Sequence, residues 1–436
     1  MKYYIWTEGC QMNVADSDRL ARALESLDIH PASNPADAGL IILNTCVVRQ
    51  SAEDRALGRL NSLKPLKRSN PDLIIGLMGC LIGIKGNSAL EKRFPWVDIF
   101  AGPSDPEPFL RFLSKRTDQQ DSESWRQLVD DVLDAEFGIT TEAQHTVSEN
   151  LPIVLGCSHA CTYCVIPNRR GREQSRDAKK IISEAQVMAD HGAKELVLLG
   201  QIVDRYGLDI PGGMLLPQLL RVISQLNGVQ RLRFLTSHPN WMTDDLIDAV
   251  AELPKVMPHI EVPVQAGDDQ VLAAMRRGYT NQGYRELVAR IRERVPGVSI
   301  GTDIIVGFPG ESEEAFDQTY QLLKDLRLDV AHLARYSPRP NTYSAKFLPD
   351  DVPAEEKMRR FRLLEGLQED VVGEINQQFL GQTQEVLFEG KSKNKWRGRT
   401  PTNRLVFVKS EENLLGQLRD VNISWTGPWS LQGDLL

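Results

Sequence analysis

Three cysteines lie close together near the middle of the chain. Cys157, Cys161 and Cys164 are spaced four and three residues apart, directly after a predicted strand. Iron–sulfur clusters require several thiolates that converge from a compact loop, and three thiolates on a four-iron cluster leave one iron open for a substrate group. Zinc is the alternative, because His159 could supply a fourth ligand, but zinc prefers paired C-x-x-C ligands or histidines. The spacing therefore favours an iron–sulfur cluster.

The other three cysteines each follow a predicted strand of the N-terminal region. Cys10, Cys46 and Cys80 are 36 and 34 residues apart, and each interval is about the length of one βαβ unit. Parallel strands place their carboxyl ends at one edge of a sheet, so we expect the three thiols to converge there. Gly9 and Gly79 would let the backbone turn tightly beside them. Three unrelated buried cysteines are the alternative.

The central cysteine run resembles that of the radical S-adenosylmethionine (SAM) superfamily, and Tyr163 matches the aromatic position before the last cysteine. This resemblance implies a partial (β/α)6 barrel and a cluster that, when reduced, cleaves SAM to a 5′-deoxyadenosyl radical. A narrower resemblance, to the methylthiotransferases, spans essentially the whole chain. It is carried by residues 9–13, 44–52, 78–80, 236–239, 262–265, 275–279, 302–311 and 336–340.

The methylthiotransferase resemblance implies two [4Fe-4S] clusters, one on the central cysteine run and an auxiliary one on the three N-terminal cysteines. One SAM would donate a methyl group to sulfur at the auxiliary cluster, and a second would give the radical that removes hydrogen from carbon 2 of an adenine. The branch acting on N6-dimethylallyladenosine at position 37 of tRNA fits best. The implied partners are the tRNA anticodon loop and a reductant such as flavodoxin or ferredoxin. We assign no general acid or base.

Two other functions remain open from the sequence. A related methylthiotransferase would act on threonylcarbamoyl-adenosine in tRNA or on a ribosomal protein. A non-catalytic iron–sulfur RNA-binding protein would explain the cysteines and the basic residues, but not the motifs at the predicted cofactor edge. Release of 5′-deoxyadenosine separates an enzyme from such a binding protein.

The residues that the resemblance assigns to SAM binding lie in the cysteine run or at the ends of predicted strands. Relatives usually carry Asn-Val-Asn after the strand-end glutamine, whereas this chain has Ile202, Val203 and Asp204, so no polar role passes to Ile202. For Asp303, a structural or helix-capping role is the alternative to SAM binding. The assigned residues are Tyr163, Gly200, Gln201, Gln265, Thr302 and Asp303.

A basic stretch, residues 391–404, carries six positive charges and no acid. It lies in a C-terminal region that resembles a TRAM domain, which implies RNA binding. Cations attract phosphates, and Trp396 would offer a stacking face to an unpaired base; a solvated surface is the alternative. The predicted RNA-binding residues are Lys391, Lys393, Lys395, Trp396, Arg397, Arg399 and Arg404. A weaker second cluster comprises Arg59, Lys64, Lys67 and Arg68.

Composition agrees with a cytoplasmic enzyme of several domains. The chain has 436 residues, a length that is too great for one hydrophobic core. Of these residues, 41% are hydrophobic and 25% are charged. No signal peptide or membrane span is expected. Six cysteines in a reducing compartment favour metal binding over disulfides. The net charge of −8 arises within residues 117–149, so it does not argue against RNA.

The elements that would position these residues fall into four segments. Residues 1–116 predict a doubly wound parallel sheet with strands at 3–6, 40–43 and 73–78, and helices at 16–27 and 51–63 capped by Asp16 and Ser51. Residues 117–149 form an acidic linker with one helix near 125–133. Residues 150–376 predict a partial (β/α)6 barrel. Its strands are expected at 152–156, 195–200, 231–236, 259–264, 299–307 and 330–337, with helices such as 178–191 and 281–294.

The last segment, residues 377–436, predicts a small antiparallel β-barrel. Short apolar stretches at 383–390, 403–410 and 417–427 are separated by turn residues, which is typical of such barrels. The fold class is therefore α/β in the first two folded segments and all-β in the last.

Overall fold

The computed structural model describes residues 1–48, 50–86, 88–116, 127, 129–132 and 146–436. Of the predicted helix near 125–133, residues 127 and 129–132 are described and are helical, while most of the acidic linker lies outside the described residues. The chain divides into two compact units. The N-terminal unit comprises Met1–Gln144, Leu155–His159 and Cys164–Gln174, and the C-terminal unit comprises His145–Val154, Ala160–Tyr163 and Ser175–Leu436.

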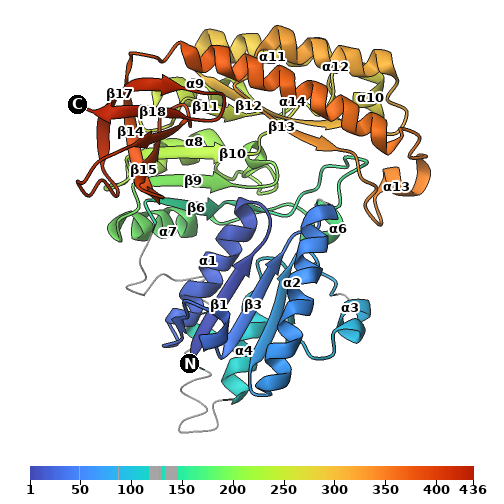
Figure 1. Cartoon of the computed structure of the whole chain (residues 1–436), viewed down its shortest axis with the longest axis vertical. Coiled ribbons are helices and arrows are strands. Elements are labelled where there is room, and N and C mark those ends of the chain that lie inside the picture. The colour runs from blue at the N-terminus through green and yellow to red at the C-terminus, as the bar shows by residue number, and fades with distance from the viewer. Residues whose placement is uncertain (49, 87, 117–126, 128, 133–145) are drawn as a thin grey trace. The chain divides into compact units, whose positions relative to one another are not determined.

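The N-terminal unit contains a five-stranded parallel sheet in the order β2-β1-β3-β4-β5. Figure 1 shows β1 and β3 of this sheet, with α1 and α2. Its strands are β1 (Lys2–Thr7), β2 (His30–Pro31), β3 (Leu40–Thr45), β4 (Ile74–Gly79) and β5 (Ile99–Ala101). Its helices are α1 (Gln11–Glu25), η1 (Pro35–Asp37), α2 (Gln50–Ser69), α3 (Ser88–Arg93), α4 (Glu107–Arg116) and α6 (Ile166–Arg170).

Both faces of this sheet are covered, as a doubly wound fold requires. Leu40 and Ile42 of β3 belong to one core with α1 and α4, while Ile41 and Leu43 belong to a second core with α2 and α3. Successive side chains of a strand point to opposite faces, so a strand buried on both sides reads as a continuous apolar run. The predicted fold class is confirmed here.

Two of the predicted helix caps were wrong. α1 begins at Gln11 and α2 at Gln50, so Asp16 and Ser51 lie inside their helices. The first turns of α1 bury polar residues, including Asn13 and Asp16. Because these polar side chains face the interior, the apolar periodicity starts later than the helix does.

Six parallel strands form the partial barrel of the C-terminal unit. β6 (Ser148–Pro152), β9 (Glu195–Leu199) and β10 (Arg231–Leu235) make one sheet, and β11 (His259–Glu261), β12 (Ser299–Val306) and β13 (Val330–Arg335) make the other. β10 lies beside β11, so the order follows the sequence. β6 begins four residues before the predicted strand at 152–156. Two-residue strands, β7 (Val154–Leu155) and β8 (Gln174–Ser175), complete the set.

Helices connect successive strands of the partial barrel. α7 ends at Asp190, one residue before its predicted end, and α11 matches its prediction. The helices are α7 (Ala178–Asp190), η2 (Val203–Arg205), α8 (Leu216–Ile223), α9 (Asp244–Glu252), α10 (Asp269–Ala274), α11 (Asn281–Arg294), α12 (Glu313–Leu326), α13 (Tyr343–Phe347) and α14 (Ala354–Gln377). None of the helices described is long and apolar enough to cross a membrane.

The C-terminal β-barrel is closed in the order β14-β15-β16-β18-β17. Its strands are β14 (Thr383–Ser392), β15 (Lys395–Arg399), β16 (Leu405–Val408), β17 (Leu418–Thr426) and β18 (Leu431–Leu435). Four of its pairs are antiparallel as predicted, and β16 and β18 pair in parallel. β15 lies within the basic stretch, where charged residues conceal the alternation of a strand.

Candidate metal centres and cofactor edge

The three N-terminal cysteines converge at the carboxyl edge of the parallel sheet. Cys10 follows β1, Cys46 follows β3 and Cys80 follows β4, and these three strands are neighbours. Electrostatic interactions join the thiols to one another. None of the six cysteines forms a disulfide. Of the three N-terminal ones, Cys10 is exposed while Cys46 and Cys80 are buried. The expected convergence is confirmed.

Two glycines make room for this approach. Gly9 has φ +136°, and a Cβ there would lie 2.8 Å from the Cβ of Cys46. Gly79 has φ +96°, and a Cβ there would lie 2.5 Å from Oδ1 of Asn44. Positive φ and such short distances exclude a side chain at both positions. The predicted tight turns beside the cysteines are confirmed.

A buried polar network joins the loops that carry the cysteines. Nδ2 of Asn13 donates to Oδ1 of Asn44 at 3.0 Å and to the carbonyl of Thr45 at 2.9 Å. Nδ2 of Asn44 donates in return to the carbonyl of Asn13 at 2.8 Å and to Oγ of Ser17 at 3.0 Å. Cys10 Sγ donates to Oδ1 of Asn13 at 3.5 Å. Satisfied buried networks of this kind fix loop positions.

Arg170 reaches the same site from α6. Its Nη2 donates to Oδ2 of Asp16 at 2.9 Å and to Oδ1 of Asn13 at 3.2 Å, and its Nη1 donates to Oγ of Ser104 at 3.3 Å. The positive charge of the guanidinium acts on both Cys80 and Cys10. Its Nε has no hydrogen-bond partner among the described residues. No sequence pattern pointed to Arg170.

Burial and charge act in opposite directions on the thiols. Burial raises the pKa of Cys80 to about 11 and also raises the pKa of Cys46, while the positive charge of Arg170 opposes both shifts. For Arg170 itself, burial favours the neutral form, but Asp16 and the thiols outweigh it and raise the pKa. A buried cation beside thiols stabilises their deprotonated form, which is the form that binds metals.

The donor set fits a cluster better than a single ion. Among the described residues, no three His, Cys, Asp or Glu side chains are placed to hold one metal ion. A four-iron cluster is larger, so its thiolates stand farther apart than the ligands of one ion. Three free thiols at one sheet edge, with an unpartnered buried N–H of Arg170 beside them, suit a sulfur-rich anionic group.

The central cysteine run spans both units. Cys157 and Cys164 belong to the N-terminal unit, and Cys161 and Tyr163 belong to the C-terminal unit. Cys157 is buried, whereas Cys161 and Cys164 are partly exposed. The ring of Tyr163 lies edge-on to Phe308, with 6.5 Å between centroids.

A second buried arginine contacts the central run. Nη1 of Arg277 donates to Sγ of Cys161 at 3.2 Å, Nε donates to the hydroxyl of Tyr279 at 2.8 Å, and Nη2 donates to the carbonyl of Pro263 at 3.1 Å. Tyr279 donates in turn to the carbonyl of Val264 at 2.8 Å. Arg277 belongs to a motif that carried the family resemblance, but no role had been assigned to it.

The predicted cofactor residues Gly200 and Gln201 lie at a strand end, as expected, whereas the prediction was wrong for Thr302 and Asp303, which lie inside β12. Gly200 and Gln201 directly follow β9. A Cβ on Gly200 would lie 3.1 Å from that of Val154, so this turn is close-packed. The carboxylate of Asp204 accepts from the backbone N–H of His238 at 3.0 and 3.2 Å. Asp204 therefore braces the neighbouring loop.

Thr302, Gln265 and Asp303 meet between β11 and β12. Oγ1 of Thr302 accepts from the backbone N–H of Val264 at 3.0 Å and from the hydroxyl of Tyr284 at 3.3 Å, so it links β12 to the segment that follows β11 and to α11. Gln265 has φ +77° and donates its N–H to the carbonyl of Asp303 at 2.8 Å. The side chain of Asp303 is half-buried.

The prediction that Trp396 offers a stacking face was wrong. Trp396 is 5% exposed and belongs to the core of the C-terminal barrel. The alternation of β15 turns Trp396 inward and Arg397 outward. Nζ of Lys391 lies 4.5 Å from the centre of the indole ring.

The basic stretch divides into an outward and an inward part. Lys391, Lys393 and Arg397 are exposed, whereas Lys395 donates to Gln432. In the inward part, Arg404 pairs with Asp329 and donates to Asn376, and Arg399 pairs with Glu389. In the second basic cluster, Lys67 pairs with Asp98 at 2.8 Å. The inward residues therefore bind the protein itself.

Buried arginines of β10 hold the C-terminal barrel against the partial barrel. Nη1 of Arg231 donates to the carbonyl of Arg399 at 2.6 Å. Arg233 donates to the carbonyls of Pro401 and Thr400 at 2.7 and 2.8 Å and pairs with Glu195 at 2.7 Å. Residues 399–401 therefore form a docking segment.

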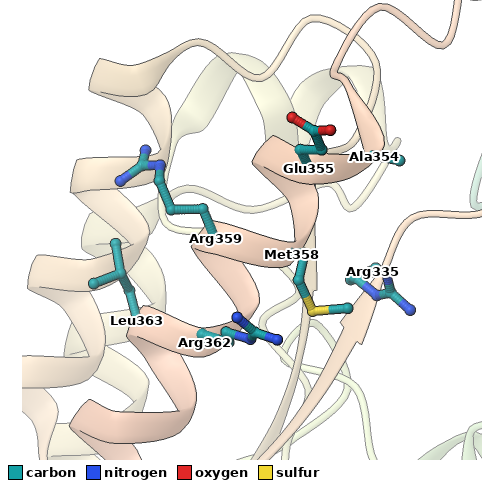
Figure 2. A pocket seen from close by; sticks show the side chains of 7 residues that line it. All are labelled: Arg335, Ala354, Glu355, Met358, Arg359, Arg362 and Leu363. Carbon is teal, nitrogen blue, oxygen red and sulfur yellow. The ribbon is translucent and has the colours of Figure 1, made fainter.

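An open cavity of about 660 Å³ lies between β13 and α14, away from every predicted ligand. Figure 2 shows Arg335 on β13 and Met358 on α14 beside it. Arg359 pairs with Glu313 and Glu356. No cysteine or predicted cofactor residue is among the residues that line this cavity.

Comparison with family models divides the chain as the fold does. The Radical SAM superfamily model matches residues 151–323, the model of uncharacterized protein family UPF0004 matches residues 2–102, and the TRAM domain model matches residues 377–436. The radical SAM methyltransferase TsrM from Kitasatospora setae shares the fold, with a TM-score of 0.53, 14% identity and coverage of 88% of this chain and 80% of that chain.

Curated relatives match over the full length. The tRNA-2-methylthio-N(6)-dimethylallyladenosine synthase of Roseiflexus sp. (strain RS-1) is 48% identical over 100% of this chain and 89% of the relative. The proteins of the same name from Chloroflexus aurantiacus and Thermoanaerobacter pseudethanolicus are 47% and 39% identical, over 99% and 100% of this chain and 91% and 92% of the relatives.

Fold, cysteine sites and matches together define a radical SAM enzyme. Within that class, the chain belongs to the family of tRNA-2-methylthio-N(6)-dimethylallyladenosine synthases. Membership confirms the predicted family and the predicted cofactors, two [4Fe-4S] clusters and SAM, over the zinc alternative.

Proposed function

We propose that this chain methylthiolates carbon 2 of N6-dimethylallyladenosine at position 37 of tRNA. The observation that carries the proposal is similarity over 99% or more of the chain to synthases named for this product. The cysteines at the edge of the N-terminal sheet support it, because a second sulfur-rich site is what carbon–sulfur bond formation adds to radical chemistry. A tRNA substrate also implies a cytoplasmic location.

Each cysteine set would hold one cluster. Cys10, Cys46 and Cys80 would bind the auxiliary cluster, and the central cysteine run, residues 157–164, would bind the radical cluster. When bound, the two clusters and two SAM molecules supply the sulfur, the methyl group and the radical that removes hydrogen from carbon 2. The protein fixes their positions through the Asn13–Asn44 network and through the contact of Arg277 with Cys161.

The strand ends of the partial barrel would hold the SAM that gives the radical. The turn at Gly200 is close-packed, so SAM would approach the backbone closely there. The positive φ of Gln265 brings its backbone amide beside β12. The half-buried carboxylate of Asp303 suits a ribose hydroxyl. The full set of proposed SAM contacts is Tyr163, Gly200, Gln201, Gln265, Thr302 and Asp303.

The exposed part of the basic stretch would bind tRNA. Lys391, Lys393 and Arg397 face outward on β14, the β14–β15 turn and β15, where they can reach phosphates. A small electron-transfer protein, flavodoxin or ferredoxin, would reduce the radical cluster. Each of the four segments would then have one role. Residues 1–116 would bind the auxiliary cluster and residues 117–149 would connect the domains. Residues 150–376 would form the radical, and residues 377–436 would bind RNA.

Nucleoside mass spectrometry of tRNA after anaerobic turnover with SAM and a reductant tests the proposal. The expected product is the 2-methylthio form of N6-dimethylallyladenosine. Methylthiolated threonylcarbamoyl-adenosine, or a modified ribosomal protein, would instead identify a sibling activity. Absence of both product and 5′-deoxyadenosine from cluster-loaded protein would contradict an enzymatic function.

A further inference from the structure

Each cysteine site has a buried arginine in contact with a cluster-ligand candidate. Arg170 is 7% exposed and lies among the N-terminal thiols, and Arg277 is 5% exposed and lies on Cys161. Both belong to Arg-Arg pairs, with Arg169 and Arg276 as the neighbours. Buried charges require a partner, so the charge balance at each site can be determined from its contacts.

The charge of Arg170 is neutralised inside the protein. Its Nη2 and Oδ2 of Asp16 are 2.9 Å apart, and the two side chains are 3% and 0% exposed. Its other partners, Asn13 and Ser104, are neutral. The auxiliary site therefore contains an ion pair with no net charge.

The charge of Arg277 has no such partner. Its hydrogen bonds go to a thiol, a phenol and a backbone carbonyl, those of Cys161, Tyr279 and Pro263. Among the described residues, no carboxylate forms an ion pair with it. The negative charge that remains to balance Arg277 is that of the Cys161 thiolate and of the radical cluster that this thiolate would bind.

We propose that this difference directs the electron to the radical cluster. A one-electron donor loses an electron, the cluster gains it, and no bond or proton changes. The added negative charge is stabilised by an uncompensated cation at short distance in a dry environment, because Coulomb energy grows as the effective dielectric falls. Net charge and hydrogen bonds to sulfur set cluster potentials. Arg277 thus raises the potential of the radical cluster, while the Arg170–Asp16 pair leaves that of the auxiliary cluster nearly unshifted.

This inference rests on the proposed cluster assignment, but its test needs neither tRNA nor SAM. Full-length protein with the three N-terminal cysteines changed to alanine would carry only the radical cluster. Its midpoint potential is measured by anaerobic redox titration with dithionite, followed by electron paramagnetic resonance. Iron content and circular dichroism establish that each variant is folded and loaded.

In that background, Arg277→Gln is expected to shift the midpoint to a more negative potential. Arg277→Lys keeps the positive charge, so its midpoint potential is expected to stay close to that of the protein with Arg277. Arg276→Gln is the matched control, since it removes the same charge from an exposed neighbour that stacks on Tyr343. An unshifted midpoint in Arg277→Gln, or an equal shift in Arg276→Gln, would overturn the proposal.

The auxiliary cluster is measured in protein with Cys157, Cys161 and Cys164 changed to alanine. The double variant Asp16→Asn with Arg170→Gln removes the whole pair and is expected to keep the wild-type midpoint. Asp16→Asn alone frees the cation and is expected to raise the midpoint. A large shift in the double variant, or none in the single one, contradicts the proposed charge balance. If Arg277→Gln shifts its midpoint as expected but the wild-type protein forms no 2-methylthio product in tRNA, the proposed function fails and this inference stands.

Discussion

Asp16 and Arg170 form a buried ion pair at 2.9 Å although 154 residues separate them in the chain. Arg170 lies six residues after Cys164, and Asp16 lies in α1 directly after Cys10. The segment that follows the central cysteines is thereby fixed to the helix that follows the first N-terminal cysteine. The pair makes the auxiliary site depend on residues from distant parts of the sequence.

We expect Arg170→Ala to destabilise the N-terminal unit by about 3 kcal/mol, because the carboxylate of Asp16 would stay buried without its cation. Chemical unfolding of the apoprotein, followed by circular dichroism, gives the difference. The double variant Asp16→Asn with Arg170→Gln leaves no unpaired charge and is expected to lose less. A single variant as stable as wild type would show that water or another cation replaces the guanidinium.

The cysteine positions could be predicted from the sequence, but the arginines could not. Strand-end spacing brings Cys10, Cys46 and Cys80 to one edge because parallel strands share a direction. Arg170 and Arg277 acquire their roles from tertiary contacts that leave no periodic or spacing signal. The predicted start of α1, at Asp16, came too late, because the first turns of the helix face a buried polar site and lack the expected apolar pattern.

The two cysteine sites should be separable by substitution. Cys157→Ala is expected to abolish 5′-deoxyadenosine formation, because the radical cluster would lose a ligand. Cys10→Ala is expected to keep 5′-deoxyadenosine formation and lose methylthiolation. Both products are measured by mass spectrometry after anaerobic turnover. Radical formation that survives Cys157→Ala would remove the central run from the radical site.

Neutralising Lys391, Lys393 and Arg397 is expected to weaken tRNA binding and to lower the slope of log affinity against log salt by about 2. Fluorescence anisotropy with labelled tRNA at several salt concentrations measures both quantities. Arg404→Gln serves as the control, because Arg404 already pairs with Asp329 and does not face outward. Equal slopes in the triple variant and wild type would exclude the C-terminal barrel from the RNA footprint.

The basic stretch also shows where sequence reasoning ends. The sequence predicts that its charges form one surface, but the side chains of β15 alternate between the two faces of the strand. Trp396 therefore lies in the core, while Arg397 is exposed. Arg404 turns toward the protein and pairs with Asp329, and the backbone carbonyls of the docking segment, residues 399–401, accept hydrogen bonds from β10. Charge composition could not reveal this division, since it depends on the strand register and on which face meets the partial barrel.

His259 should make the C-terminal unit acid-sensitive. Burial, with added repulsion from Arg233 and Arg399, lowers its pKa to about 4, and its Nδ1 has no hydrogen-bond partner among the described residues. Unfolded histidine has a pKa of about 6.5, so the unfolded state binds the proton first as the pH falls. The contribution of neutral His259 to the free energy of unfolding is therefore fully present above pH 6.5 and is lost between pH 6.5 and 4, by about 3 kcal/mol.

Urea denaturation between pH 4.5 and 7.5 measures this effect as the difference between His259→Gln and wild type. His259→Gln removes the titrating group, so its midpoint is expected to fall less steeply with acid than that of wild type. His191→Gln, at an exposed position after α7, serves as the matched control for the substitution itself. If His259→Gln and wild type lose stability in parallel across this range, the acid sensitivity comes from other groups and His259 carries none of it.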